Sequence, residues 1–366
     1  MTWFQYSLIG KLALKLVEKK GSVQFKSRVI YFVYHNILWV SEPLQLIVES
    51  HLLGHKAGQQ SGDVLYAFNN LLNAIYDDYS SGQSFDVVRK NVLDFLRELH
   101  CQGLKIFFKL AILLLSQIMV LKEGLHMSGA ALVDNMPSEG EILADAASGP
   151  SISAYGKIHY LSRAFLFRQM DDALLNIDIS GAVAESHHQL NPHYLMGYFY
   201  EGLASFELAR LAGTNESSTW IERGQSVLAK MRCWSEQSLW NWKNKVLLLE
   251  AESLSLSGDL DRAGPLYDDA IRCANNHKFI HEEAIACELA GMFYYERGFR
   301  QKSYSYLVHS VKSYEEWGAH AVARRVDAHI RGNFDAKVDQ LLSNTELDHL
   351  FAPSRENEKK CQGVVD

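Results

Sequence analysis

The chain has 366 residues, of which 48% are hydrophobic and 22% are charged, so it can bury two or three separate cores or one long repeat array. Its net charge is −7, and the sequence has no basic stretch that could neutralise the phosphates of a nucleic acid. This argues against a nucleic-acid-binding protein. The 5 cysteines are odd in number and form no C-x-x-C pair, so neither a disulfide framework nor a zinc knuckle is predicted. We therefore expect a protein of a reducing compartment, the cytoplasm.

Helical periodicity runs through the whole chain, and the 6 prolines are few for a chain in which each would cost a helix a hydrogen bond. The predicted fold class is therefore all-α. Residues 1–21 are predicted to form an amphipathic helix, because their lysines lie within and after the apolar part, whereas a signal peptide carries its charge ahead of it. Residues 110–121 are apolar between Lys109 and Lys122. A membrane span needs about 20 such residues, so we expect a buried helix and no membrane partner.

Composition divides the chain into four parts. Residues 1–129 are predicted to form N-terminal helical repeats, and residues 154–330 to form C-terminal repeats of the tetratricopeptide (TPR) type. Between them, residues 130–153 contain prolines and glycines among small and acidic residues, which predicts a long connecting loop. Residues 331–366 are predicted to be a helical extension followed by a disordered tail.

The clearest internal repeat is centred on two glycines, Gly258 and Gly298. The TPR pattern places small and large residues at fixed steps around a turn glycine, so that two paired helices can approach closely. The first unit has Ala251, Leu254, Ala263, Tyr267 and Ala270 at these steps, and the second has Gly291, Tyr294, Ser303, Leu307 and Ser310. The predicted architecture is a TPR-like α-solenoid of antiparallel helix pairs.

Several details of the repeat lead to further expectations. Pro265 should remove a hydrogen bond from its helix or delay the start of that helix. A weaker unit surrounds Ala173 but has no turn glycine. Gly258 is expected to adopt a positive φ angle in its turn. Gly291 is expected inside a helix, at a position where a methyl group should be tolerated and a bulky side chain should not.

The C-terminal units resemble a known family. Residues 267–271 (YDDAI), 281–290 (HEEAIACELA), 293–298 (FYYERG) and 317–319 (WGA) are similar to the helical-repeat region of very large predicted ATPases of signal transduction. A weaker, collinear similarity covers residues 5–325. In that family a protein kinase domain and a nucleotide-binding ATPase domain precede the repeats, and GAF, PAS, histidine kinase or cyclase modules often follow. The resemblance implies a repeat region that works beside signalling domains. Its first match lies partway into the family's solenoid, so we expect Met1 to be a truncated or re-annotated start.

The catalytic motifs of that family are missing from this sequence. It has no G-x-x-x-x-G-K-[ST] loop, no H-R-D and no D-F-G, the motifs that hold the phosphates, orient the acceptor and bind magnesium. We therefore predict that the chain is not an enzyme, has no cofactor and has no catalytic or cofactor-binding residues.

Two histidine patterns have some features of metal sites. His281-Glu282 begins a zinc-protease motif, but Ile285 stands where a second histidine must share the same helix face. The second pattern comprises His187, His188 and His193. Adjacent residues of a helix point about 100° apart, and Asn191-Pro192 marks a helix boundary, so capping and surface roles are predicted and no metal residue is expected.

The remaining candidates are aromatic and acidic groups. The aromatic series is expected to pack between helices, and it comprises Phe293, Tyr294, Tyr295, Tyr304, Tyr306, Tyr314 and Trp317. Trp234, Trp240 and Trp242 are expected to anchor neighbouring helices. Acid–base chemistry needs a cleft and unequal pKa values. The acidic group is therefore expected on a solvated face and at an N-cap, and it comprises Glu250, Glu252, Asp259, Asp261, Asp268 and Asp269.

The predicted function is a non-catalytic scaffold that binds a protein partner or relays conformational state to adjacent signalling domains. One alternative is an orphan fragment with no independent role. Another is that the chain belongs to a longer protein whose ATP-binding and kinase activities reside in domains outside this sequence.

Overall fold

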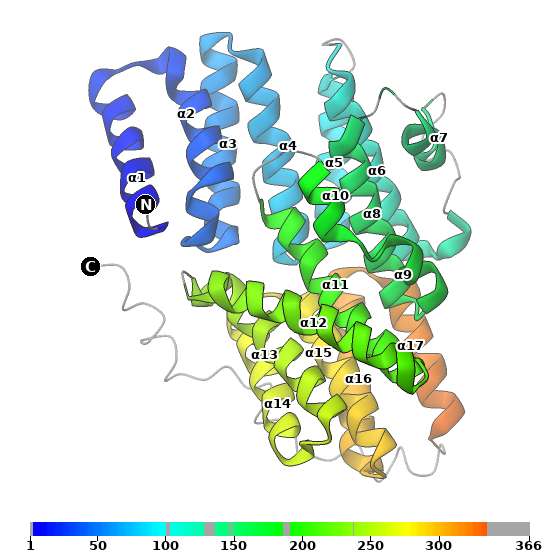
Figure 1. The fold of residues 1–366 in the computed structure, drawn as a ribbon. Helices are drawn as coiled ribbons and strands as arrows, with labels where there is room; N and C mark the ends of the chain where they lie inside the picture. Colours follow the sequence, from blue (N-terminus) through cyan, green and yellow to red (C-terminus); the bar gives the residue numbers. More distant parts are fainter. Residues whose placement is uncertain are drawn as a thin grey trace.

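The computed structural model describes residues 3–99, 103–127, 136–145, 147, 149–185, 191–236 and 238–334. Every regular element in these residues is a helix, which confirms the all-α prediction. We divide the chain into an upper part, α1–α10, and a lower part, α11–α17. In Figure 1 most of the upper part lies in the upper half of the view and most of the lower part in the lower half, and α9 and α11 lie where the two parts meet.

The upper part consists of short to medium helices in chain order. They are α1 (Trp3–Lys20), α2 (Val23–Asn36), the 3-10 turn η1 (Leu38–Val40), α3 (Leu44–Ser61), α4 (Val64–Ser81), α5 (Phe85–Leu99), α6 (Lys105–Glu123), the 3-10 turn η2 (Leu125–Met127), α7 (Glu139–Ala144), α8 (Gly149–Leu166), α9 (Met170–Asn176) and α10 (Ile179–Glu185). The lower part contains α11 (Pro192–Leu211), α12 (Thr214–Ser235), α13 (Leu239–Ser257), α14 (Leu260–Asn276), α15 (Ile280–Glu296), α16 (Arg300–Trp317) and α17 (His320–Asn333).

Consecutive helices contact each other extensively, most of all α3 with α4, α13 with α14 and α15 with α16. Tight turns make this possible. Helices α3, α13 and α16 end at Gly62, Gly258 and Gly318, which adopt φ angles of 77°, 83° and 97°. A glycine has no Cβ to clash in this left-handed conformation. The positive φ predicted for Gly258 is confirmed.

The small residues of the repeat pattern lie between paired helices. Ala251, Ala263 and Ala270 are buried between α13 and α14. In the next pair, the Ser303 hydroxyl donates a hydrogen bond to the carbonyl of Gly291 at 2.8 Å. The Ser310 hydroxyl does the same to the carbonyl of Ala284 at 2.9 Å. These contacts hold α16 close to α15.

One of the two outcomes expected for Pro265 is found, and the expected loop needs correction. Helix α14 begins at Leu260 and contains Pro265 in its interior. The proline therefore does not delay the start of the helix but removes a hydrogen bond, because the carbonyl of Asp261 is left without its helical donor. The expected loop at 130–153 is partly helical. Ser138 and Glu141 form a capping box that starts α7, and α8 begins at Gly149. The sequence S-x-x-E at 138–141 carried this signal.

Helix α7 is held by a buried ion pair. Arg163 of α8 binds Glu139 through two charge-assisted hydrogen bonds, and the Ser116 hydroxyl of α6 donates a third at 2.8 Å. A buried glutamate is tolerated only when its charge is compensated in this way. At the other end of the chain, α17 continues to Asn333, so the start of the expected extension at 331–366 is the last turn of α17. Residues 335–366 lie outside the described part.

The upper and lower parts meet in a buried contact. The side-chain amide of Asn241 in α13 donates to the carbonyls of Trp39 at 3.0 Å and Glu42 at 2.8 Å, and it accepts from the backbone N–H of Leu44 at 3.2 Å. The indole rings of Trp39 and Trp242 pack edge to face with centroids 5.8 Å apart. Three satisfied hydrogen bonds fix the beginning of α3 against α13.

A second contact joins α5 and α6 to α16 and α17. The rings of Phe85 and Trp317 have centroids 4.4 Å apart. Arg324 of α17 donates to the carbonyl of Glu123 at the end of α6 at 3.0 Å. Residues 111–118, 120 and 121 of α6 are buried.

Among the described residues, no helix is long and apolar enough to cross a bilayer.

Gly291→Ala is expected to lower the free energy of unfolding by about 1–3 kcal/mol through overpacking, contrary to the tolerance expected from the sequence. A Cβ at position 291 would lie 2.6 Å from Cγ of Leu307 and 3.3 Å from its backbone nitrogen, so α16 would have to move. Urea unfolding followed by circular dichroism measures the loss. Gly332→Ala is the matched control, because it lies in α17 with no atom within 4 Å. An equal effect in the two variants would contradict the proposed clash.

Candidate functional site

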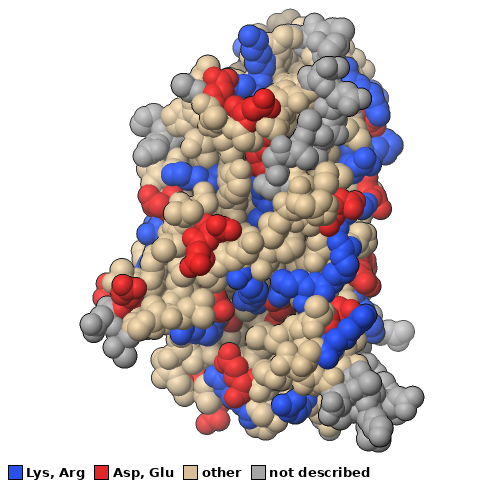
Figure 2. Space-filling model, turned by 90° about the vertical axis from the view of Figure 1, so that its right-hand side faces the viewer, with Lys and Arg blue, Asp and Glu red and all other residues tan. Residues whose placement is uncertain are grey.

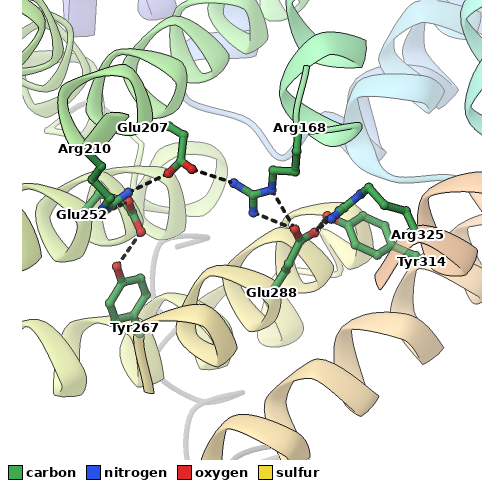
Figure 3. A network of polar contacts seen from close by, with 8 residues as sticks. All are labelled: Arg168, Glu207, Arg210, Glu252, Tyr267, Glu288, Tyr314 and Arg325. Atoms are coloured by element: carbon green, nitrogen blue, oxygen red, sulfur yellow. Dashed lines mark hydrogen bonds and ion pairs between the residues drawn. The ribbon is translucent and has the colours of Figure 1, made fainter. Parts of the chain in front are cut away.

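A cleft of about 310 Å³ lies in the lower part of the molecule, between α9, α11 and α13–α17. Its apolar lining comprises Met170, Leu289, Met292, Phe293, Leu307 and Val326, with the exposed Leu211 at the edge. Its walls carry a network of charged side chains, with Arg168, Glu207, Arg210, Glu252, Glu288 and Arg325 (Figure 3). We call it the charged cleft.

Glu288 of α15 is the centre of the network. One carboxylate oxygen accepts hydrogen bonds from Nε and Nη2 of Arg168, at 3.0 and 2.6 Å. The other accepts from Nη2 of Arg325 at 2.7 Å and from the Tyr314 hydroxyl at 3.0 Å. The Glu288 side chain is buried. The two arginines outweigh the desolvation that opposes ionisation, and they lower the pKa of Glu288 to about 2.

The network continues along the cleft to a second buried carboxylate. Glu252 of α13 accepts from Nη2 of Arg210 and from the Tyr267 hydroxyl, both at 2.5 Å. Arg210 also binds Glu207 at 3.0 Å, and Glu207 lies 3.9 Å from Arg168. The contacts therefore form one chain of alternating charges across α11, α13, α15 and α17 (Figure 3).

Arg168 enters the cleft from a strained turn. It lies between α8 and α9 with a φ angle of 59°, a conformation in which a residue with a Cβ is disfavoured. Its guanidinium also lies over the ring of Phe165, 5.0 Å from the centroid. The ion pair with Glu288 and this ring contact hold the turn in a conformation that the backbone alone would avoid.

The charges of the cleft are balanced among themselves. Three arginines pair with three glutamates in the network, and the fourth glutamate of the lining, Glu296, is 55% exposed and pairs with Arg297 at 3.5 Å. The three buried or partly buried carboxylates of the network already accept hydrogen bonds or ion pairs from arginines. A carboxyl group with a pKa near 2, as in Glu288, is a poor general acid or base at neutral pH. Glu288 itself is therefore not suited to proton transfer at neutral pH. Two buried atoms at the α17 edge have no hydrogen-bond partner among the described residues, Nε of Arg325 and Nε2 of His329.

The histidine patterns of the sequence have structural roles where they are described. Glu282 binds Lys245 at 2.8 Å and also accepts from Asn244, while the His281 ring packs on Trp317 with centroids 5.1 Å apart. The four polar residues of this group are buried: Asn244, Lys245, His281 and Glu282. No group of three or more His, Cys, Asp or Glu in the described ranges is placed to hold a metal ion.

His193 is not on the surface, contrary to expectation. It is buried with its ring stacked on Tyr155, at 4.5 Å between centroids, and edge-on to His159 at 5.0 Å. Burial lowers its pKa to about 3. The helix boundary expected at Asn191-Pro192 is confirmed, because α11 begins at Pro192 and the Asn191 side chain caps it by accepting from the N–H of Tyr194 at 3.0 Å. His187 and His188 lie outside the described residues.

The aromatic prediction is confirmed. Tyr306, Tyr314 and Trp317 are buried, and Tyr294 stacks on Tyr306 with centroids 5.6 Å apart. The remaining members of the series, Phe293, Tyr295 and Tyr304, pack against the same core. The three expected tryptophan anchors each contact a neighbouring helix: Trp234 contacts Tyr198, Trp240 stacks on His277, and Trp242 contacts Trp39.

The solvated acidic face was predicted wrongly at one position. Glu252 is buried in the charged cleft, where Arg210 and Tyr267 provide the compensation that the expectation overlooked. Asp259 does precede α14, but its side chain makes no capping hydrogen bond and pairs with Arg262 at 3.1 Å. Asp268 accepts a hydrogen bond from Tyr306.

Sequence reasoning missed the other charged members of the network, which come from the turn before α9 and from helices α11, α15 and α17. One signal was present: Glu288 stands between Cys287 and Leu289 within the apolar run of α15, and a charge inside such a run indicates a buried partner. On the face shown in Figure 2, positive and negative side chains are interspersed.

No protein-family model matches the chain, and no curated protein matches it either.

Proposed function

We propose that this chain is a non-catalytic helical-repeat scaffold that binds a segment of a protein partner in the charged cleft. The cleft itself supports this. Its volume of about 310 Å³ lies at the lower end of the range of ligand sites, roughly 300–1,000 Å³. It holds one or two apolar side chains on Met292 and Leu289, while the charged walls meet the polar backbone of the bound segment.

The architecture that fits this function is a TPR-like solenoid of antiparallel helix pairs. The buried small residues at the repeat steps and the glycine turns between paired helices support it. In such arrays each pair packs on the next and the inner face forms an extended binding surface. The charged cleft is bordered by α11, α13, α15 and α17, the alternate helices that this arrangement places on the inner side.

The proposed partner is a cytoplasmic protein or an adjacent signalling domain of the predicted-ATPase type. The network offers a route for relay, because Glu288 ties the turn before α9 to α17. A segment that displaced Arg168 or Arg325 from Glu288 would change how these elements pack. No observation favours the alternative of a kinase or ATPase activity in this chain, since the carboxylates of the cleft are held by arginines and the phosphate-binding motifs are missing from the sequence.

The proposal is tested by selecting 12-residue peptides from a random library on the immobilised full chain. We expect an enriched motif with an apolar residue beside polar or charged ones. Leu211→Glu places a charge at the edge of the cleft, and Leu239→Glu is its matched control, because the two side chains are 65% and 62% exposed and only Leu211 lines the cleft.

The selected peptide should bind Leu239→Glu as it binds the unaltered chain and should bind Leu211→Glu at least about tenfold more weakly, a change of about 1.4 kcal/mol. Fluorescence anisotropy gives the three affinities. Failure to enrich any motif, or equal binding to the two variants, would rule out the cleft as the partner site.

A further inference from the structure

A second and larger cavity, of about 630 Å³, lies in the upper part of the molecule. We call it the amide cavity. Helices α2, α4, α6, α8 and α11 contribute its walls. It shares no residue with the charged cleft, and the scaffold function proposed above does not use it.

The floor of the amide cavity is built from tyrosines. Tyr76, Tyr155 and Tyr194 are buried beside it, and the rings of Tyr76 and Tyr155 pack edge to face with centroids 5.0 Å apart. The Tyr76 hydroxyl donates to the carbonyl of Leu110 at 2.9 Å, which fixes its ring. The Tyr155 hydroxyl accepts from Asn191 at 3.3 Å, and no acceptor for its own proton lies among the described residues, so that proton can be donated to a ligand.

Carboxamides line one side of the cavity. Asn69 and Asn73 lie one turn apart on α4, and each uses one amide N–H to bind a carbonyl one turn earlier, at 3.0 and 2.8 Å. These bonds orient both side chains, and among the described residues neither carboxamide oxygen nor the second N–H of either side chain has a hydrogen-bond partner. Asn36 at the end of α2 also lines the cavity, and its side chain makes no hydrogen bond within the part of the chain that the structure describes. The wall therefore presents donors and acceptors side by side.

Aromatic rings complete the opposite wall and the rim. Tyr31 stacks on His35 of the same helix, with centroids 5.1 Å apart and planes 14° from parallel. Phe32 and Ile106 are 47% and 60% exposed at the mouth. No Lys, Arg, Asp or Glu of the described ranges lines the cavity, so these walls offer a bound ion no countercharge to compensate for its lost hydration.

We propose that the amide cavity binds a neutral saccharide of two or three rings. Vicinal hydroxyls both donate and accept, which matches the carboxamides of Asn69, Asn73 and Asn36. The apolar C–H faces of a pyranose ring fit flat against aromatic side chains such as Tyr31, and the volume exceeds that of one ring. A proline-rich peptide offers mainly carbonyl acceptors, which would leave the carboxamide oxygens unmatched on desolvation.

The test uses the full chain and isothermal titration calorimetry with maltotriose, cellobiose, chitobiose, adenosine and a proline-rich decapeptide. The decisive variant is Asn73→Leu, which keeps the side-chain size and removes the amide. Asn176→Leu is the matched control. Asn176 of α9 makes the same type of bond, to the carbonyl one turn earlier at 3.2 Å, but lies outside the cavity.

We expect at least one of the saccharides to bind saturably at about millimolar concentration or below. Asn73→Leu should weaken that binding by about tenfold, the loss of one or two hydrogen bonds, and Asn176→Leu should leave it unchanged. The proposal is overturned if no saccharide saturates, if only adenosine or the peptide binds, or if the two variants behave alike. Circular dichroism at the titration temperature confirms that both variants are folded.

Discussion

Glu288→Gln is expected to lower the free energy of unfolding by about 3 kcal/mol. Glutamine keeps the shape and one acceptor oxygen but removes the charge that holds Arg168 and Arg325. Two guanidiniums would then be only partly compensated, with about a quarter of each side chain exposed to water. This exposure places the expected loss at the lower end of the range for breaking a buried ion pair.

Urea unfolding of Glu288→Gln and Glu296→Gln checks this expectation. Glu296 lies on the same helix and lines the same cleft, but its side chain is 55% exposed and its ion pair with Arg297 is long, at 3.5 Å. Its substitution should change stability by less than about 0.5 kcal/mol. If the two variants lose equal stability, the network does not hold the helices of the lower part together.

His193→Phe is expected to stabilise the protein at acidic pH relative to the unaltered chain. Burial lowers the folded-state pKa of His193 to about 3, whereas an unfolded histidine has a pKa of about 6.5. Between pH 3 and 6.5, His193 is therefore protonated in the unfolded state and neutral in the folded state. Above pH 6.5 the protonation of His193 does not reduce the free energy of unfolding. As the pH falls from 6.5 toward 3, protonation of the unfolded state lowers that free energy.

The linkage amounts to about 1.4 kcal/mol per pH unit below 6.5, or about 2 kcal/mol at pH 5. Asp78, whose pKa burial raises to about 6, acts in the opposite sense in this window, so the two proteins must be compared at each pH. The difference in urea-unfolding free energy between His193→Phe and the unaltered chain should grow by about 2 kcal/mol from pH 8 to pH 5. A difference that stays constant would show that His193 is not held neutral.

The sequence was informative wherever a local pattern determines structure. The helical period, the turn glycine Gly258 and the aromatic core around Tyr306 follow from spacing that the chain displays within a few residues. The capping box at 138–141 was equally local and was overlooked because prolines and glycines surround it. The tolerance of Gly291 was misjudged for a different reason, since the distance to Leu307 depends on how closely α15 and α16 approach.

The charged cleft could not be predicted in the same way. Arg168, Glu207, Glu252, Glu288 and Arg325 are brought together only when α11, α13, α15 and α17 lie side by side. No spacing rule joins residues so far apart, and the burial of Glu252 reverses its apparent place on a solvated face. The amide cavity has a local trace in Asn69, Asn73 and Tyr76, which repeat at helical steps on α4. That trace becomes meaningful once the facing aromatic residues are known.

The contact of Asn241 with residues 39–44 affects how the molecule folds. In a row of helices that touch only their neighbours, an end pair can melt while the rest stays ordered. Here the amide of Asn241 is bonded to backbone about 200 residues earlier. Closing such a loop costs about 5 kcal/mol of chain entropy, which is offset only after both α3 and α13 have formed. The contact therefore forms late in folding, and once formed it makes the melting of the first helices depend on the stability of helices two hundred residues away.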